Sequence, residues 1–432
     1  MSTTSTAATR TTLALPSADG TVAEYALTGA ARPELGPFGR PEAPIASRKV
    51  YAAAHVVPVM TADNTPGAPA TLDWDATLAY RHELWSYGLG VADAMDTAQR
   101  GMGLDYAATC ELIRRSAAEA ASVVASAKYP ALAGRTVRDL VACGAGTDQL
   151  DPASVAPGPE GLAAVRDAYL EMLDVVEGSG AKVIIMCSRA LARVATSADD
   201  YLAVYGTLLE RAEEPVVLHW LGTMFDPALA GYWGSDDVAE ATATFLELIR
   251  THADKVDGVK VSLLDAEHET QLRAALPAGV RLYTGDDFNY PELIHGDGEA
   301  YSDALLGIFA AIYPAASTAL QAFDAGDDAR GRAILDSTRE LGQHIFSAPT
   351  FYYKTGIAFL AWLNGHQAGF QMVGGLHSGR SIAHLARTFV LADQAGLLLQ
   401  PELAAERLRG LLETYGIAQP GGSAGTGAEA TA

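Results

Sequence analysis

Lys260 has the clearest potential for chemistry in this sequence. It lies inside the apolar run Gly-Val-Lys-Val-Ser (258–262), and this run is typical of a β-strand whose alternate side chains point to opposite faces. Burial on the inner face lowers the pKa of a lysine amine from ~10.4 towards ~7–8. The neutral amine can then attack a carbonyl group and form a Schiff base. The structural alternative is a lysine that pairs with an inward-pointing acid.

The other lysines give no such signal. We expect them to reach water, because they lie at segment ends or in helical stretches: Lys49, Lys128, Lys182, Lys255 and Lys354. A pair of polar residues, Tyr353 and Lys354, interrupts the apolar C-terminal part and is a weaker candidate to reach the site.

The elements that must position Lys260 form a repeating pattern. From Val50 onward, short apolar runs alternate with longer stretches of helical periodicity, and this order demands parallel strands. Eight such strands close most simply into a (β/α)8 TIM barrel, an α/β fold, which we assign to residues 48–325. The predicted strands are 50–59, 90–95, 139–144, 182–188, 215–220, 258–264, 280–285 and 298–305.

An open doubly wound sheet is the alternative, and it usually carries a glycine-rich dinucleotide fingerprint. Here Gly144 and Gly146 are followed by Gln149 where the third glycine would stand, so no nucleotide cofactor is expected.

Both ends of the chain extend beyond the barrel. Residues 1–47 combine a polar start with a predicted β-hairpin over 12–28, in which a Gly-containing turn joins two β-rich runs. Residues 326–419 form a helical region that could cover the barrel mouth or a subunit interface. Its helices, counted from the last strand, are expected at 307–326, 328–346, 352–364, 380–395 and 401–415. Residues 1–10 and 420–432 are predicted to be disordered.

Composition excludes several classes of partner. The 432-residue chain has a formal net charge of −22, which repels nucleic-acid backbones and anionic membranes. Its three cysteines form no CxxC pair, so neither a disulfide framework nor a cysteine-rich zinc site is expected. The sequence shows no secretory signal and no stretch of ~18 apolar residues. We therefore expect a cytoplasmic enzyme with a small-molecule substrate.

Three strand segments resemble a known family. Glu-Glu-Pro-Val-Val-Leu-His (213–219), Asp-Gly-Val-Lys-Val-Ser (257–262) and Tyr-Thr-Gly-Asp-Asp (283–287) are similar to strands five to seven of the dihydrodipicolinate synthase and N-acetylneuraminate lyase superfamily. The resemblance covers roughly residues 48–365. It implies a class I aldolase or lyase barrel without a cofactor, with Lys260 as the Schiff-base lysine and a homo-oligomeric assembly (dimer or tetramer). The divergence suggests a synthase-like branch of unassigned function.

The substrate-binding turn after the second strand departs from that family. Where the family has Gly-Thr-Thr-Gly-Glu, this chain reads Asp-Thr-Ala-Gln-Arg (96–100). Only the hydroxyl of Thr97 is kept, so pyruvate bound in the family manner is not expected. Arg100 could hold an anionic group by bidentate hydrogen bonds, whereas Asp96 suggests a neutral, hydroxyl-rich ligand.

His219 replaces the tyrosine that shuttles a proton in the family. Imidazole is a general acid and base near neutral pH, although a buried structural histidine is the alternative. Trp220 could stack on a sugar face or pack in the core. Three further candidates for substrate binding lie near strand ends, where a TIM barrel builds its active site: His55, Asp286 and Asp287. The two aspartates could instead cap the helix that follows them.

Three functional hypotheses remain. The first is a Schiff-base lyase or aldolase acting on a small 2-oxo acid or keto sugar, without a metal. The second is a metal-dependent, sugar-processing barrel with imidazole and carboxylate ligands. The third is a sugar-binding barrel that does not catalyse. The ligands available to the second are His55, Asp93, His219 and Asp286 or Asp287.

Overall fold

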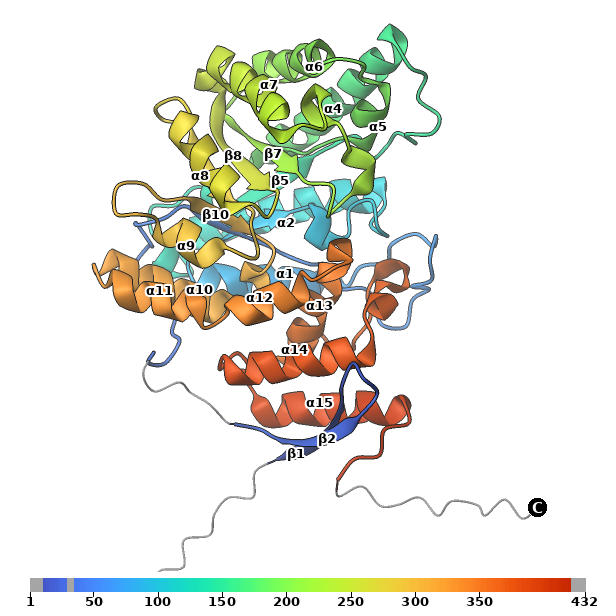
Figure 1. Cartoon of the computed structure of the whole chain (residues 1–432), viewed down its shortest axis with the longest axis vertical. Helices are drawn as coiled ribbons and strands as arrows, with labels where there is room; N and C mark the ends of the chain where they lie inside the picture. Colours follow the sequence, from blue (N-terminus) through green and yellow to red (C-terminus); the bar gives the residue numbers. More distant parts are fainter. Residues whose placement is uncertain (1–10, 29–34, 421–432) are drawn as a thin grey trace, which may run out of the picture.

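Eight parallel strands close into one barrel (Figure 1). The computed structural model describes residues 11–28 and 35–420. Each strand pairs with the next, and β10 pairs with both β9 and β3. The TIM barrel prediction is confirmed. The strands are β3 (Val50–Ala53), β4 (Gly90–Asp93), β5 (Val141–Ala145), β6 (Lys182–Ile185), β7 (Val216–Leu221), β8 (Val256–Ser262), β9 (Arg281–Thr284) and β10 (Asp303–Leu306).

The eighth strand begins later than predicted. The run 298–305 was expected to be extended, but its first residues form a turn in which Asp297 accepts hydrogen bonds from the backbone N–H groups of Glu299 and Ala300 (3.0 and 2.8 Å). Aspartate side chains commonly stabilise such turns. Pairing therefore starts only at Asp303.

Helices follow the strands and enclose the barrel. Several begin at an aspartate whose carboxylate accepts a backbone N–H of the first turn, the usual stabilising cap; Asp73, singled out in the sequence, caps α1 in this way. The helices of the barrel layer are α1 (Trp74–Ser86), α2 (Tyr106–Ser126), α3 (Val137–Leu140), α4 (Pro159–Ser179), α5 (Arg189–Val194), α6 (Ala198–Arg211), α7 (Val238–Thr251), α8 (Ala266–Ala275), α9 (Tyr290–His295) and α10 (Phe309–Asp324).

Two buried layers separate the inside of the barrel from its outside. Val259 and Val261 belong to the large apolar layer between strands and helices, whereas a smaller cluster that includes Val217 and Tyr283 fills the barrel interior. Because side chains alternate along β8, Lys260 faces the interior with this second group. Its register partner on β7 is His219.

The C-terminal helices pack together at one end of the barrel (Figure 1). They are α11 (Asp328–Asp336), α12 (Arg339–Ile345), α13 (Tyr353–Leu363), α14 (Ile382–Gln394) and α15 (Pro401–Thr414). The predicted helix 328–346 is divided at Ser337 and Thr338 into α11 and α12. Helix α13 contacts the short helical turn Asp96–Ala98 that follows β4, so this region reaches the barrel mouth.

The predicted N-terminal hairpin is confirmed as β1 (Thr12–Pro16) and β2 (Val22–Ala26). It packs against α14 and α15 rather than the barrel. The Tyr25 hydroxyl donates a hydrogen bond to Asp393 (2.6 Å), and the backbone N–H of Ala14 donates to Gln419 Oε1 (3.1 Å). Of the segments predicted to be disordered, 1–10 and 420–432, all residues except Pro420 lie outside the described residues.

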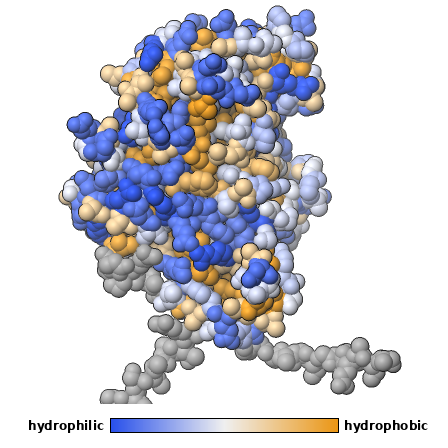
Figure 2. All heavy atoms as spheres, in the orientation of Figure 1, coloured by the Kyte–Doolittle hydropathy of each residue, from blue (hydrophilic) through white to orange (hydrophobic). Residues whose placement is uncertain are grey.

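The face of the molecule shown in Figure 2 mixes hydrophilic and hydrophobic residues. Hydrophilic residues cover much of the middle of the face shown in Figure 2, with hydrophobic residues scattered between them. Within the part of the chain that the structure describes, no helix has the length and apolar character needed to cross a bilayer.

Candidate active site

The amine of Lys260 lies inside the barrel, near the carboxyl end of β8. Its side chain is buried, with the residue 7% exposed. Space for it depends on Gly285, the first residue after β9. A Cβ atom at this position would lie 2.9 Å from Lys260 Cε and 2.2 Å from Ser262 Oγ. Both distances are shorter than van der Waals contact, so a larger residue at position 285 would displace the lysine.

The electrostatic surroundings of Lys260 favour a neutral amine. Burial lowers the pKa of the Lys260 amine, and the nearby charges of Asp96 and Asp287 oppose only part of this decrease. Among the described residues, none forms an ion pair or a hydrogen bond with Lys260 Nζ. The structural alternative, a lysine locked against an acid, is therefore not what the structure shows.

Lys182 provides an internal contrast. It is also buried on a barrel strand, with 9% of the residue exposed, but it is the first residue of β6 and lies at the opposite, amino-terminal end of the barrel. Its Nζ forms an ion pair with Asp257 (3.0 Å), which also accepts a hydrogen bond from the Tyr283 hydroxyl (2.7 Å). Lys182 is thus a buried structural lysine with a counter-ion. The expectation that it reaches water was wrong.

His219 lies beside Lys260 on the neighbouring strand. Its Nε2 is 3.2 Å from Ser262 Oγ, and its buried Nδ1 has no hydrogen-bond partner among the described residues. Burial, and then the charge of Lys260, hold the pKa of His219 well below its ordinary value. The imidazole is therefore neutral near pH 7, and it can orient the Ser262 hydroxyl or relay a proton.

Asp286 and Asp287 have different surroundings. Asp286 accepts hydrogen bonds from the backbone N–H groups of Phe288 and Asn289 (both 2.9 Å), within the turn that precedes α9. Helix α9 has no side-chain cap, so the capping role weighed as the alternative is not what the structure shows. Asp287 accepts a hydrogen bond from the backbone N–H of Ile308 (2.7 Å) and lies near Lys260. Burial raises the pKa of Asp287 to about 8. This carboxyl group therefore holds a proton near neutral pH.

Helix α13 contributes a tyrosine to the site. The Tyr353 hydroxyl is 2.7 Å from Thr97 Oγ1. Burial raises the pKa of Tyr353 well above its ordinary value, and the charges of Asp96 and Asp287 add to this effect. The phenol stays protonated and can donate a hydrogen bond beside both carboxyl groups. Tyr353, one of the two polar residues singled out in this part of the sequence, thus reaches the barrel mouth.

Lys354, the next residue, is a third buried lysine. It is 2% exposed, and its Nζ lies 3.1 Å from Met102 Sδ. Burial lowers the pKa of Lys354 to about 8, although the charge of Asp96 opposes the decrease. The expectation that Lys354 reaches water was wrong, because the C-terminal helices cover this side of the barrel.

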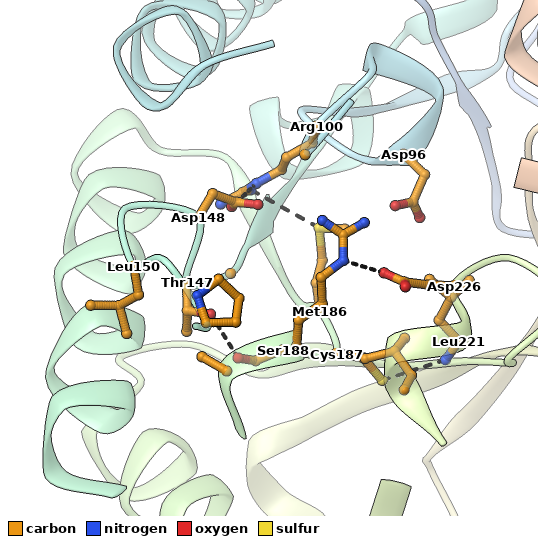
Figure 3. Close-up of a pocket in the computed structure, with 16 residues that line it drawn as sticks. Asp96, Arg100, Thr147, Asp148, Leu150, Met186, Cys187, Ser188, Leu221 and Asp226 are labelled. Atoms are coloured by element: carbon orange, nitrogen blue, oxygen red, sulfur yellow. Dashed lines mark hydrogen bonds and ion pairs between the residues drawn. The ribbon is translucent and has the colours of Figure 1, made fainter. Parts of the chain in front are cut away.

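A cavity of about 120 Å³ opens over the carboxyl ends of β4 to β7 (Figure 3). Lys260 is not one of its lining residues, but Asp96, whose charge acts on Lys260, is. The cavity is small compared with pockets for drug-sized ligands. It is lined by Asp96, Arg100, Gly101, Gly146, Thr147, Asp148, Leu150, Pro152, Met186, Cys187, Ser188, Arg189, Ala190, Leu221, Asp226 and Leu229.

Arg100 has protein partners for most of its guanidinium group. It forms an ion pair with Asp148 and donates hydrogen bonds to the carbonyl oxygens of Ala94 (3.1 Å) and Gly144. Its side chain is 1% exposed. These contacts hold the loops after β4 and β5 together, so the suggested bidentate binding of an anion would require them to be broken.

Two predicted site residues, His55 and Trp220, lie away from Lys260 and its neighbours. His55 Nε2 is hydrogen-bonded to Gln367 (2.9 Å), and burial lowers the pKa of His55 to about 3. Trp220 packs against Trp233 and Phe245 in the layer between strands and helices. It alternates with His219 along β7, so it points out of the barrel and cannot stack on a ligand inside it.

The residues proposed as metal ligands are not brought together at one site either. Asp93 forms a buried ion pair with Arg81 (2.8 Å), and His55 faces Gln367. Across residues 11–28 and 35–420, no group of three or more histidine, cysteine, aspartate or glutamate side chains has the arrangement of a metal site.

A comparison with protein families identifies the chain. A family model described as "Protein of unknown function (DUF993)" matches residues 13–417. The chain belongs to this family. No curated protein sequence matches this DUF993 member.

Solved structures confirm the resemblance at the level of fold. The dihydrodipicolinate synthase of Bacteroides thetaiotaomicron has a TM-score of 0.56 at 14% identity, over 79% of this chain and 98% of that one. The enzyme of Acinetobacter baumannii, solved in complex with pyruvate, has a TM-score of 0.55 at 14% identity, over 81% and 99%. That of Thermotoga maritima has 0.52 at 14%, over 82% and 100%. The DUF993 chain shares their barrel and extends beyond it.

Proposed function

We propose that this protein is a class I lyase or aldolase that forms a Schiff base between Lys260 and a small carbonyl substrate. One observation carries the proposal: a buried lysine amine near the carboxyl end of a barrel strand, which forms no ion pair with any described residue and lies within the electrostatic influence of Asp96 and Asp287. A buried amine with a lowered pKa is the state that condenses with carbonyl groups. Lys182 has a counter-ion and lies at the other end of the barrel, and Lys354 lies on α13 with its amine against Met102. We therefore assign the role to Lys260.

The neighbouring groups suit the proton transfers of this chemistry. As the Lys260 nitrogen bonds to the carbonyl carbon, the oxygen takes up one proton from that nitrogen, and a second proton from an acid lets it leave as water. Asp287, protonated near neutral pH, is the acid we assign to this transfer. The hydroxyl groups of Tyr353 and Thr97 form a hydrogen-bonded pair that can stabilise the developing oxygen charge. The resulting iminium withdraws electrons from the adjacent carbon, which permits C–C cleavage, condensation or dehydration.

The solved structures support the choice of substrate class without fixing it. The Acinetobacter baumannii relative was solved with pyruvate, a 2-oxo acid. The turn that follows β4 reads Asp-Thr-Ala-Gln-Arg (96–100), which departs from the Gly-Thr-Thr-Gly-Glu of the resembling family. A 2-oxo acid and a keto sugar are therefore both included in the proposal. We place the enzyme, as the sequence predicts, in the cytoplasm as a homo-oligomer, and light scattering of the purified protein tests the oligomeric state.

Borohydride trapping tests the proposal directly. The purified protein is incubated with pyruvate or with dihydroxyacetone and then reduced with sodium borohydride, and tryptic peptides are examined by mass spectrometry. We expect a reduced adduct on Lys260 with at least one probe. The K260M variant should give no adduct, and Lys182 in the same sample should stay unmodified, because its charge is held by Asp257.

Two results would overturn the proposal. One is the absence of any adduct on Lys260 while the enzyme turns over a carbonyl substrate. The other is equal labelling of Lys182 and Lys260, which would mean that the reagent reacts with lysines unselectively. Binding of a sugar without turnover or adduct would favour the non-catalytic barrel instead.

A further inference from the structure

Asp96 connects the cavity with Lys260. It follows β4, lines the cavity, and its carboxylate points into the open space in Figure 3. Its charge acts on three buried groups around the barrel mouth: Lys260, Tyr353 and Lys354. Asp96 is thus a cavity-lining residue whose charge is felt at the Lys260 amine, which makes it a candidate to contact a substrate bonded to Lys260 and extending into the cavity.

Asp96 differs from the other two carboxylates of the cavity wall. Asp148 is paired with Arg100, and Asp226 is paired with Arg189. In the described part of the chain, the Asp96 side chain makes no hydrogen bond and no ion pair. Its oxygen atoms are thus available to a ligand, and forming that contact breaks no existing interaction.

We propose that Asp96 is the base that takes the hydroxyl proton in an aldol cleavage, and that the substrate is a β-hydroxy carbonyl compound with further hydroxyl groups. This inference rests on the proposed role of Lys260. It names the reaction type and a catalytic residue that the Schiff base alone leaves open.

The proposed cleavage starts from the covalent adduct. The substrate is joined to Lys260 as an iminium, and the hydroxyl group on the β carbon lies against Asp96. Asp96 accepts the hydroxyl proton while the bond between the α and β carbons breaks. The β carbon leaves as an aldehyde, and the bonding electrons move to the iminium nitrogen to give an enamine. Protonation of the enamine at the α carbon and hydrolysis of the imine then release the second product.

The neighbouring groups are less suited to this step. Asp287 retains its proton near neutral pH and accepts the Ile308 N–H. His219 is not a cavity-lining residue and is held neutral with a strongly lowered pKa. The Tyr353 phenol stays protonated. Each of these groups can donate or relay a proton, whereas Asp96 presents an uncommitted carboxylate to the cavity.

The rest of the cavity wall matches hydroxyl groups better than a second anion. Both guanidinium groups, Arg100 and Arg189, already have a carboxylate partner. The hydroxyl groups of Thr147 and Ser188, 2.6 Å apart, lie on the same wall. Carboxylate oxygens accept and hydroxyl groups donate or accept hydrogen bonds. Such a wall can both donate hydrogen bonds to the hydroxyl groups of a polyol chain and accept hydrogen bonds from them.

The test separates carbonyl binding from C–C bond cleavage. Wild type and the D96N variant are each given dihydroxyacetone, and the borohydride-trapped adduct on Lys260 is quantified. The same proteins are given dihydroxyacetone with glyceraldehyde, and the ketohexose formed by condensation is measured by chromatography. We expect D96N to keep the trapped adduct and to lose condensation by about 10²–10⁴-fold, the usual contribution of a general base.

Two further variants keep the test decisive if D96N folds poorly. D96E retains a carboxylate and should recover part of the condensation rate. D96A should recover activity when formate is added, because formate can enter the space that the side chain vacates. Circular dichroism of each variant establishes that the barrel is intact.

Each outcome has a distinct meaning. Condensation by D96N at the wild-type rate, or loss of the Lys260 adduct in a folded D96N protein, overturns the role of Asp96. An adduct on wild-type Lys260 without condensation product overturns the aldol assignment and leaves the Schiff base standing. No adduct on Lys260 with dihydroxyacetone or pyruvate, despite turnover of a carbonyl substrate, refutes the proposed function itself.

Discussion

Replacing Lys354 by methionine should stabilise the protein at neutral pH. The Lys354 amine is buried against Met102 Sδ, and none of the described residues forms an ion pair with it. Methionine has a similar length and no charge, so K354M removes the cost of burying an ammonium group while it largely preserves packing. Replacing a lysine at the surface would not be expected to raise the stability in this way.

The magnitude follows from the pKa of Lys354. Burial lowers it from the ordinary 10.5 to about 8, and each pH unit corresponds to about 1.4 kcal/mol, which gives about 3 kcal/mol. Below pH 8 both folded and unfolded chains carry the proton, so the folded wild type bears the full cost. Between pH 8 and 10.5 only the unfolded chain keeps the proton, so the stability of the wild type rises relative to K354M.

The assay is urea unfolding of wild type and K354M at several values between pH 7 and pH 10.5, followed by circular dichroism. We expect the free-energy advantage of K354M to shrink by about 3 kcal/mol across this range. The control is K128M, which removes an exposed lysine and should show little pH dependence. A K354M advantage that does not change with pH, or that resembles K128M, would refute the reasoning.

Three further predictions concern the groups around Lys260. G285A should destabilise the fold by about 1–3 kcal/mol and reduce borohydride trapping, because its Cβ would approach Lys260 Cε to 2.9 Å; unchanged trapping would contradict this crowding. For D287N, the ratio of wild-type to variant trapping rates should fall as the pH rises through about 8, where Asp287 loses its proton; a ratio independent of pH would count against Asp287 as the acid. Y353F removes the hydroxyl that pairs with Thr97 and should lower kcat by about fivefold, from a lost hydrogen bond of about 1 kcal/mol; an unchanged steady-state kcat, at equal thermal stability of the two proteins, would contradict this role.

The barrel was predictable because its signals are local. The alternation of β8 alone indicates that Lys260 shares a face with Ser262, and the structure shows them together beside Gly285. The same alternation places Trp220 on the opposite face from His219, so the outward position of Trp220 was already present in the sequence. Its aromatic character drew attention to a sugar-stacking role that the register excludes.

Other parts of the site depend on contacts that no local pattern reveals. Thr97 meets Tyr353 across 256 positions, and the ion pair of Arg100 with Asp148 joins two different loops. Lys182 begins a strand in the sequence, and only the closed barrel shows that Asp257 neutralises it. The choice of Lys260 follows from residue order, whereas the surroundings that set its reactivity follow from closure of the barrel and packing of α13.

The order in which the chain is synthesised bears on when the site becomes complete. All barrel strands have been translated once Leu306 is made, and the reactive lysine is present by then. The Tyr353 hydroxyl comes later, and the hairpin at the beginning of the chain waits for Gln419. If Lys260 has the proposed role, a nascent chain on the ribosome contains the lysine before the tyrosine beside Thr97 has been made, and the site is complete only once α13 has been added to the barrel.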